Sequence, residues 1–126
     1  MIETISGMPE GTIGFMASGE VTREDYRDVL VPALREAAEG GAEMRLLFVI
    51  GPEFETYDPG ALFEDAKTGL DLEFAHRARW RRCAVVTDVC WIRRAINLFG
   101  FMAPGQVRCL GLNELASARD WVAATD

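Results

Sequence analysis

The chain has 126 residues, of which 49% are hydrophobic and 26% charged, and its 20 acidic and 13 basic side chains give a formal net charge of −7. This length and composition are typical of one globular domain over residues 1–126, and they exclude a disordered, collagen-like or disulfide-stapled chain. Because a net negative chain is repelled by phosphate backbones, we expect no nucleic-acid partner.

The chain begins with the pattern of a β-hairpin. Residues 2–6 and 12–17 are rich in β-branched and apolar residues, and they flank the turn-forming segment GMPEG at 7–11. We therefore expect two adjacent strands joined by a tight connection.

A helix is predicted from residue 23 to about residue 39. Thr22 and Asp25 have the spacing of a short capping box, and apolar residues recur through the segment at the helical period. Pro32 removes one backbone hydrogen bond and clashes with the preceding turn, so we expect a kink there rather than two separate helices.

The segment MRLLFVI at 44–50 is an almost continuous apolar run, which is typical of a strand covered on both faces. We expect this central strand to end at Gly51 and Pro52 and to be followed by an acidic loop at 53–57. Asp58 and Pro59 then have the form of a helix N-cap followed by proline at the first helical position. The helix that starts there is predicted to be amphipathic.

A second buried strand is predicted at 83–87, and Asp88 is placed to cap the helix that follows through Leu98 or Phe99. Residues 107–110 form the last predicted strand, and Asn113 is placed to cap a final helix at 114–124. The predicted order is ββαβαβαβα. It indicates an α/β fold with a mixed, mainly parallel five-stranded sheet and about four helices.

Large apolar side chains gather around the helix after the central strand and around the helix after Asp88. They are Phe54, Tyr57, Phe63, Leu70 and Phe74 in the first group, and Trp91, Phe99, Phe101 and Met102 in the second. Aromatic residues in turns favour an apolar surface or pocket between these two helices, although a place in the core would also account for most of them.

Charge is unevenly placed along the same part of the chain. Residues 53–73 contain seven acids and one base, Lys67, whereas residues 77–94 contain six arginines, the last of them Arg94, and one acid. Two interpretations remain open: a pair of solvated faces, or a local positive patch directed at anionic lipid or a partner.

No catalytic motif is recognisable in the sequence. The three cysteines form no CxxC pair and there is a single histidine, so we expect no catalytic residue, metal site or cofactor. One enzymatic alternative stays open, because Glu53, Glu55 and Asp58 follow the central strand, where carboxylates are placed to act as acid and base or to bind a hard cation.

Several short segments, taken in order, give the chain a family resemblance. They are TREDY at 22–26, LVPAL at 30–34, RLL at 45–47, FEDAK at 63–67, AVVTD at 84–88 with Trp91, FMAPG at 101–105 and ARDW at 118–121. Through these segments the chain resembles the SpoIIAA-like family, which is a branch of the STAS domains. STAS domains are named for sulfate transporters and anti-sigma factor antagonists. The resemblance covers essentially the whole chain and implies a STAS fold of five strands and four helices.

The resemblance also implies a function. True anti-sigma antagonists carry an Asp-Ser phosphorylation motif after the central strand, whereas here Thr56 and Tyr57 are the only hydroxyls among acids, so we expect no phosphoserine switch. The looser branch resembles lipid-binding CRAL-TRIO folds and is associated with membranes and small apolar ligands.

We therefore expect a non-enzymatic cytoplasmic module that binds an apolar or lipid-like small ligand and associates peripherally with the inner membrane. The expected contact residues are the two groups of large apolar side chains together with Lys67 and Arg94. The alternative is a signalling module that binds a protein partner through the helix after the central strand, and a homodimer also remains open.

Overall fold

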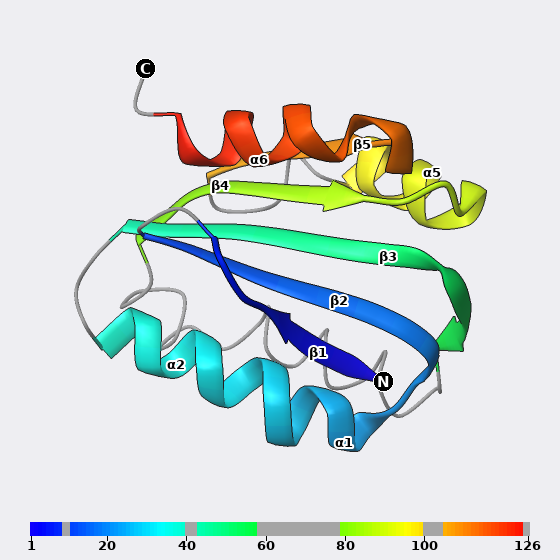
Figure 1. Cartoon of the computed structure of the whole chain (residues 1–126), viewed down its shortest axis with the longest axis horizontal. Coiled ribbons are helices and arrows are strands. Elements are labelled where there is room, and N and C mark those ends of the chain that lie inside the picture. The colour runs from blue at the N-terminus through cyan, green and yellow to red at the C-terminus, as the bar shows by residue number, and fades with distance from the viewer. Residues whose placement is uncertain (9–10, 40–42, 58–78, 100–104, 125–126) are drawn as a thin grey trace.

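The computed structural model of the chain contains a five-stranded sheet (Figure 1). It describes residues 1–8, 11–39, 43–57, 79–99 and 105–124. The strands are β1 (Ile2–Ile5), β2 (Thr12–Val21), β3 (Glu43–Tyr57), β4 (Arg79–Val86) and β5 (Gln106–Leu110). The helical elements are α1 (Arg23–Asp25), the π-helical η1 (Tyr26–Leu30), α2 (Val31–Glu39), α5 (Cys90–Phe99), the 3-10 turn η3 (Leu112–Glu114) and α6 (Leu115–Ala123).

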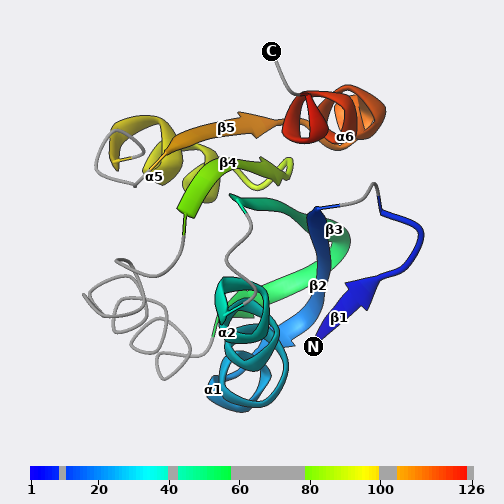
Figure 2. The same ribbon diagram turned by 90° about the vertical axis from the view of Figure 1, so that its left-hand side faces the viewer.

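The strands lie in the order β1-β2-β3-β4-β5, with β1 antiparallel to β2 and every other pair parallel. This confirms the predicted hairpin and the mixed, mainly parallel sheet. Because successive parallel strands advance in one direction and crossovers are right-handed, the connecting helices belong on one face. Figure 2 shows α2 and α5 on that face and α6, which follows the last strand, on the other. The helix expected after Asp58 lies outside the described residues.

The central strand β3 separates two apolar clusters, as its continuous apolar sequence predicts. Met44, Leu46, Phe48 and Ile50 pack with the helix at 23–39 and with Ile92 of α5. Leu47 and Val49 point to the opposite face and pack with Ala118 and Val122 of α6. The core therefore consists of two layers of side chains, one on each face of the sheet.

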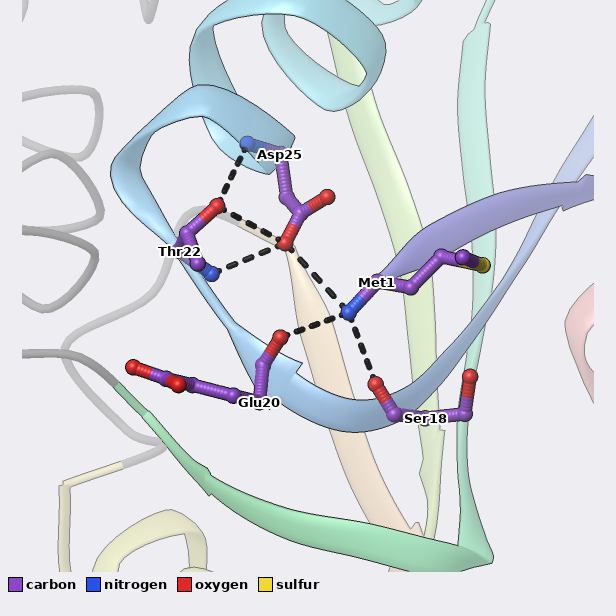
Figure 3. A network of polar contacts seen from close by, with 5 residues as sticks. All are labelled: Met1, Ser18, Glu20, Thr22 and Asp25. Atoms are coloured by element: carbon purple, nitrogen blue, oxygen red, sulfur yellow. Dashed lines mark hydrogen bonds and ion pairs between the residues drawn. The ribbon is translucent and has the colours of Figure 1, made fainter.

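The helix at 23–39 starts as its sequence indicates, and its hydrogen bonding changes shortly before Pro32. The Thr22 Oγ1 accepts a hydrogen bond from the Asp25 backbone N–H at 3.3 Å, and Asp25 Oδ2 accepts one from the Thr22 N–H at 2.8 Å, which confirms the capping box (Figure 3). The helical backbone continues to residue 39, but the N–H of Val31 bonds to the Tyr26 carbonyl, five residues back. This wide π turn lies directly before Pro32 and leaves room for its ring.

Strands β2 and β3 are both longer than predicted, because their hydrogen-bonded pairing continues past an irregular, bulged stretch. Ala17 pairs with Ile50 and Gly19 with Phe54, so β3 carries extra residues where Pro52 lies. Proline has no N–H for a ladder bond and is tolerated at such a bulge. The predictions that β3 ends at Gly51 and Pro52, and that a loop occupies 53–57, are therefore wrong.

Two predicted caps are also corrected. Asp88 Oδ1 accepts a hydrogen bond from the backbone N–H of Leu112 at 3.1 Å, so it stabilises the turn after β5 instead of its own helix. Asn113 lies inside η3, and the Glu114 side chain accepts from the Gly111 N–H at 3.2 Å. Asp88 therefore makes a long-range contact in place of a local cap, whereas at η3 the local contact is made by Glu114 instead of Asn113.

Candidate ligand-binding surface

The helix α5 is anchored to the sheet along one side. Ile92 is buried and Ile96 packs against the same apolar cluster. At the start of the helix the buried Thr87 accepts a hydrogen bond from the Val89 N–H through its Oγ1 at 3.0 Å, and its carbonyl accepts one from Arg93 Nη1 at 3.4 Å. These contacts fix the rotation of α5 about its axis.

The opposite side of α5 carries large apolar side chains into solvent. Trp91, Arg94 and Leu98 follow each other at intervals of three and four residues and therefore share one helical face. Trp91 is 51% exposed and Leu98 65% exposed. In the part of the chain that the structure describes, Met1 is the one other large apolar residue so exposed. We call Trp91, Arg94 and Leu98 the α5 stripe.

Among the described arginines of the predicted positive patch, Arg82 and Arg94 do not lie on the same face of the sheet. Arg82 is 6% exposed and donates from Nη1 to the Trp121 carbonyl at 2.6 Å, on the face covered by α6. Arg93 is half-buried against Thr87, whereas Arg94 is exposed. Because successive residues of a strand point to opposite faces, a run of arginines along β4 cannot form one surface. Arg82 is thus removed from the predicted patch.

Among the other predicted contact residues, Phe54 lies within β3 and packs, partly buried, against the apolar cluster beneath α2 and α5. Its position favours the core interpretation. Six other predicted contact residues lie outside the described residues: Phe63, Lys67, Leu70, Phe74, Phe101 and Met102. The side chains of Tyr57 and Phe99 are likewise outside the description. The predicted surface between two helices is therefore described on its α5 side.

Two carboxylates of the enzymatic alternative, Glu53 and Glu55, do not follow the central strand but belong to it. Glu53 and Glu55 are exposed along the extended end of β3, and Asp58 lies outside the described residues. On the described part of the chain, no three histidine, cysteine or acidic side chains converge as metal ligands would. Burial raises the pKa of the Cys109 thiol, an effect that the nearby Arg93 partly offsets.

Sequence reasoning missed the role of Arg45. This side chain is 8% exposed and its Nη1 donates to the carbonyls of Val122 and Ala124, at 2.7 and 2.8 Å. It thereby binds the C-terminal end of α6, where the helix dipole is negative. The available signal was an arginine at an inward position of an otherwise apolar strand.

The helices within the described ranges include none long and apolar enough to cross a membrane.

Comparison with known proteins bears on the fold and the family. The chain is similar to an uncharacterized protein of the DUF3478 family from Shewanella loihica PV-4, whose crystal structure has a SpoIIAA-like fold. The two are 23% identical with a TM-score of 0.73, and the match covers 98% of this chain and 93% of the other. No curated protein shows significant similarity to the chain. The SpoIIAA-like family model matches residues 12–123, and the chain therefore belongs to the SpoIIAA-like family.

Proposed function

We propose that the protein is a non-enzymatic SpoIIAA-like binding module whose α5 stripe contacts an apolar or lipid-like ligand, including the acyl chains at a membrane surface. One observation carries this proposal: Trp91 and Leu98 are 51% and 65% exposed on a helix whose other side is anchored in the core. Large apolar side chains that are exposed together on one surface are a feature of sites that contact a ligand, a membrane or a partner.

The chemistry of the stripe suits the boundary between an apolar and a polar phase. A tryptophan ring combines a large apolar surface with one polar N–H. It is favoured at boundaries where one end of the side chain contacts apolar groups and the other contacts water. Arg94 lies between Trp91 and Leu98 on the same helical face, and an arginine can place its apolar stem beside acyl chains while its guanidinium meets a head group.

Charge limits how this contact forms. The chain has a net charge of −7, and Arg82 is buried on the other face of the sheet. Long-range attraction to an anionic surface is therefore weak, and burial of apolar area must supply most of the binding energy. We expect binding that depends little on ionic strength.

Vesicle flotation tests the proposal. The wild-type protein should float with phosphatidylglycerol vesicles and with phosphatidylcholine vesicles, and the double variant Trp91→Ser, Leu98→Ser should not. Two charge reversals give a matched control: Arg94→Glu lies on the stripe, whereas Arg27→Glu changes an exposed arginine of η1 by the same charge. Only the first should weaken binding. Absence of flotation at low salt would contradict the membrane form of the proposal.

A protein partner is the second candidate. Tryptophan and arginine, the residue types of Trp91 and Arg94, are enriched at the energetic centres of protein interfaces. The helix first expected to carry such a contact lies outside the described residues, so the α5 stripe is the surface that supports this alternative. Sedimentation velocity and native mass spectra of the wild type and the double variant separate the two: a dimer that the double variant loses favours self-association, and a small bound mass favours a ligand.

A further inference from the structure

The strand β5 forms one edge of the sheet, next to β4 (Figure 2). The carbonyl of Leu110 accepts a hydrogen bond from the Thr87 N–H at 2.9 Å, so Leu110 directs its backbone groups toward β4. Because these directions alternate along a strand, Arg108 also faces β4, whereas Val107 and Cys109 direct their N–H and C=O groups away from the sheet. In the described part of the chain, no strand pairs with this outer side of β5.

The edge at β5 lacks the features by which proteins usually block strand addition. Proline, a bulge or a covering helix commonly protects an exposed edge. The strand has the sequence QVRCL, its pairing with β4 runs without a register shift, and α6 packs on β3 and β4. The backbone groups of Val107 and Cys109 are therefore placed to pair with another extended chain.

Positive charge flanks this edge on both faces of the sheet. Arg108 is exposed on the α6 face, where its guanidinium carbon lies 5.0 Å from the centre of the Trp121 ring. On the other face, Arg93 of α5 lies close enough to Cys109 to lower the pKa of that thiol, against the larger effect of burial. The Arg93 side chain is 40% exposed, and its contact with the Asp88 carboxylate is long, at 4.0 Å.

The charge and the unpaired backbone groups together indicate the chemistry of a partner. Side chains of an added strand alternate between the two faces, so carboxylates on it would meet Arg108 on one face and Arg93 on the other. We propose that the outer edge of β5 binds an extended, acidic polypeptide segment, which adds to the sheet as a further strand. Main-chain hydrogen bonds supply affinity in this mode of recognition, and alternate side chains supply specificity.

This edge is separate from the α5 stripe. Residues two positions apart on a helix point in nearly opposite directions, about 200° apart, so Arg93 faces β5 while Trp91 faces away from it. The proposal therefore does not depend on ligand binding by the stripe.

Selection from a phage-displayed library of random nine-residue peptides tests the proposal without assuming one sequence. The wild-type protein should enrich peptides rich in Glu and Asp, and the variant Val107→Pro should not. Proline removes the outward N–H of this residue, and it is tolerated where that N–H faces solvent, so the variant should keep its fold.

The opposite edge of the sheet offers a matched control. The Met1 carbonyl accepts a hydrogen bond from the Ser18 N–H of β2 at 2.9 Å, so by alternation Thr4 directs its N–H away from the sheet. Thr4→Pro should enrich the same peptides as the wild type. A second pair of variants tests the charge: Arg108→Glu should weaken binding of a selected peptide by about tenfold, whereas Arg27→Glu should leave it unchanged.

A synthetic copy of a selected peptide gives two readouts that need no variant of the protein. At saturation it should slow amide hydrogen exchange of Val107 and Cys109 by about tenfold or more. N-methylation of every second peptide residue should weaken binding by about tenfold or more, and N-methylation of the residues between them should not, because only alternate residues face β5.

Three results would overturn the proposal. They are a wild-type protein that enriches no peptide over Val107→Pro, binding that tolerates N-methylation at every position, and slowed exchange in Ile2–Ile5 in place of β5. Peptide binding that survives Val107→Pro but is lost in the double variant Trp91→Ser, Leu98→Ser would also overturn it, because the α5 stripe would then be the peptide site.

Discussion

The α6 face of the sheet and the outer side of α5 use the same residue types in opposite ways. On the α6 face, the ring of Trp121 lies 5.0 Å from the guanidinium carbons of both Arg82 and Arg108, and Arg82 is 6% exposed. On α5, Trp91 and Arg94 are exposed. Arginine and tryptophan side chains are therefore packed together on one surface and largely exposed to solvent on the other.

The largest expected effect on stability comes from removing the arginine that binds the end of α6. Arg45→Ala leaves the carbonyls of Val122 and Ala124, at the C-terminal end of α6, without this donor and should lower the free energy of unfolding by about 3 kcal/mol. Urea denaturation measures this loss. Arg94→Ala is the matched control and should change stability by less than about 0.5 kcal/mol. Similar losses for the two variants would remove the distinction between the faces.

The same substitution on the two tryptophans makes the comparison sharper. Trp121→Leu keeps an apolar side chain but loses the contacts with two guanidinium groups. It should lower the free energy of unfolding, measured by heat or urea, by about 1–2 kcal/mol. Trp91→Leu should change stability by less than about 0.5 kcal/mol. A larger loss for Trp91→Leu would show that Trp91 is a structural residue.

A pH titration of stability tests the polar contacts of Asp25. Because the folded pKa of Asp25 lies below its unfolded value of about 3.9, the carboxylate stabilises the fold fully above that value, and the stabilisation disappears as pH falls through the folded pKa. The stability difference between the wild type and Asp25→Asn should therefore be largest near pH 6 and shrink below about pH 3.5. Asp28→Asn, in which the side chain removed is 60% exposed, should change stability little at neutral pH. A constant difference for Asp25→Asn across this range would contradict the assignment.

The smallest effect on stability is expected at the end of the α5 stripe. Leu98→Ser removes a side chain that is 65% exposed, so the free energy of unfolding should change by less than about 0.5 kcal/mol. Flotation with vesicles should nevertheless weaken. A marked loss of stability with unchanged flotation would make Leu98 a structural residue instead of a binding residue.

The order of the strands along the chain could be predicted because each strand carries a local signal. The alternating and continuous apolar runs of β2, β3 and β4 and the capping box at Thr22 are local patterns, and the structure confirms them. The end of β3 could not be predicted, because Pro52 stops a strand in most contexts and only the bulged pairing with Gly19 accommodates it.

The surface was harder to predict than the fold. The exposure of Trp91 follows from the rotation of α5 about its axis, which the hydrogen bonds of Thr87 fix. No local sequence pattern predicts these hydrogen bonds. Sequence proximity also grouped Arg82 with Arg94, although Arg82 binds the Trp121 carbonyl of α6 and Arg94 belongs to α5, which lies on the other face of the sheet (Figure 2).

Fluorescence quenching by vesicles with brominated acyl chains tests the central claim most directly. Trp91 is half exposed on α5, whereas Trp80 and Trp121 are partly buried elsewhere. If the stripe enters the apolar phase, brominated vesicles should quench the emission of the wild-type protein and leave that of Trp91→Leu nearly unchanged. Equal quenching of the two proteins, or no quenching of the wild type, would contradict the assignment of α5 as the lipid-contacting surface.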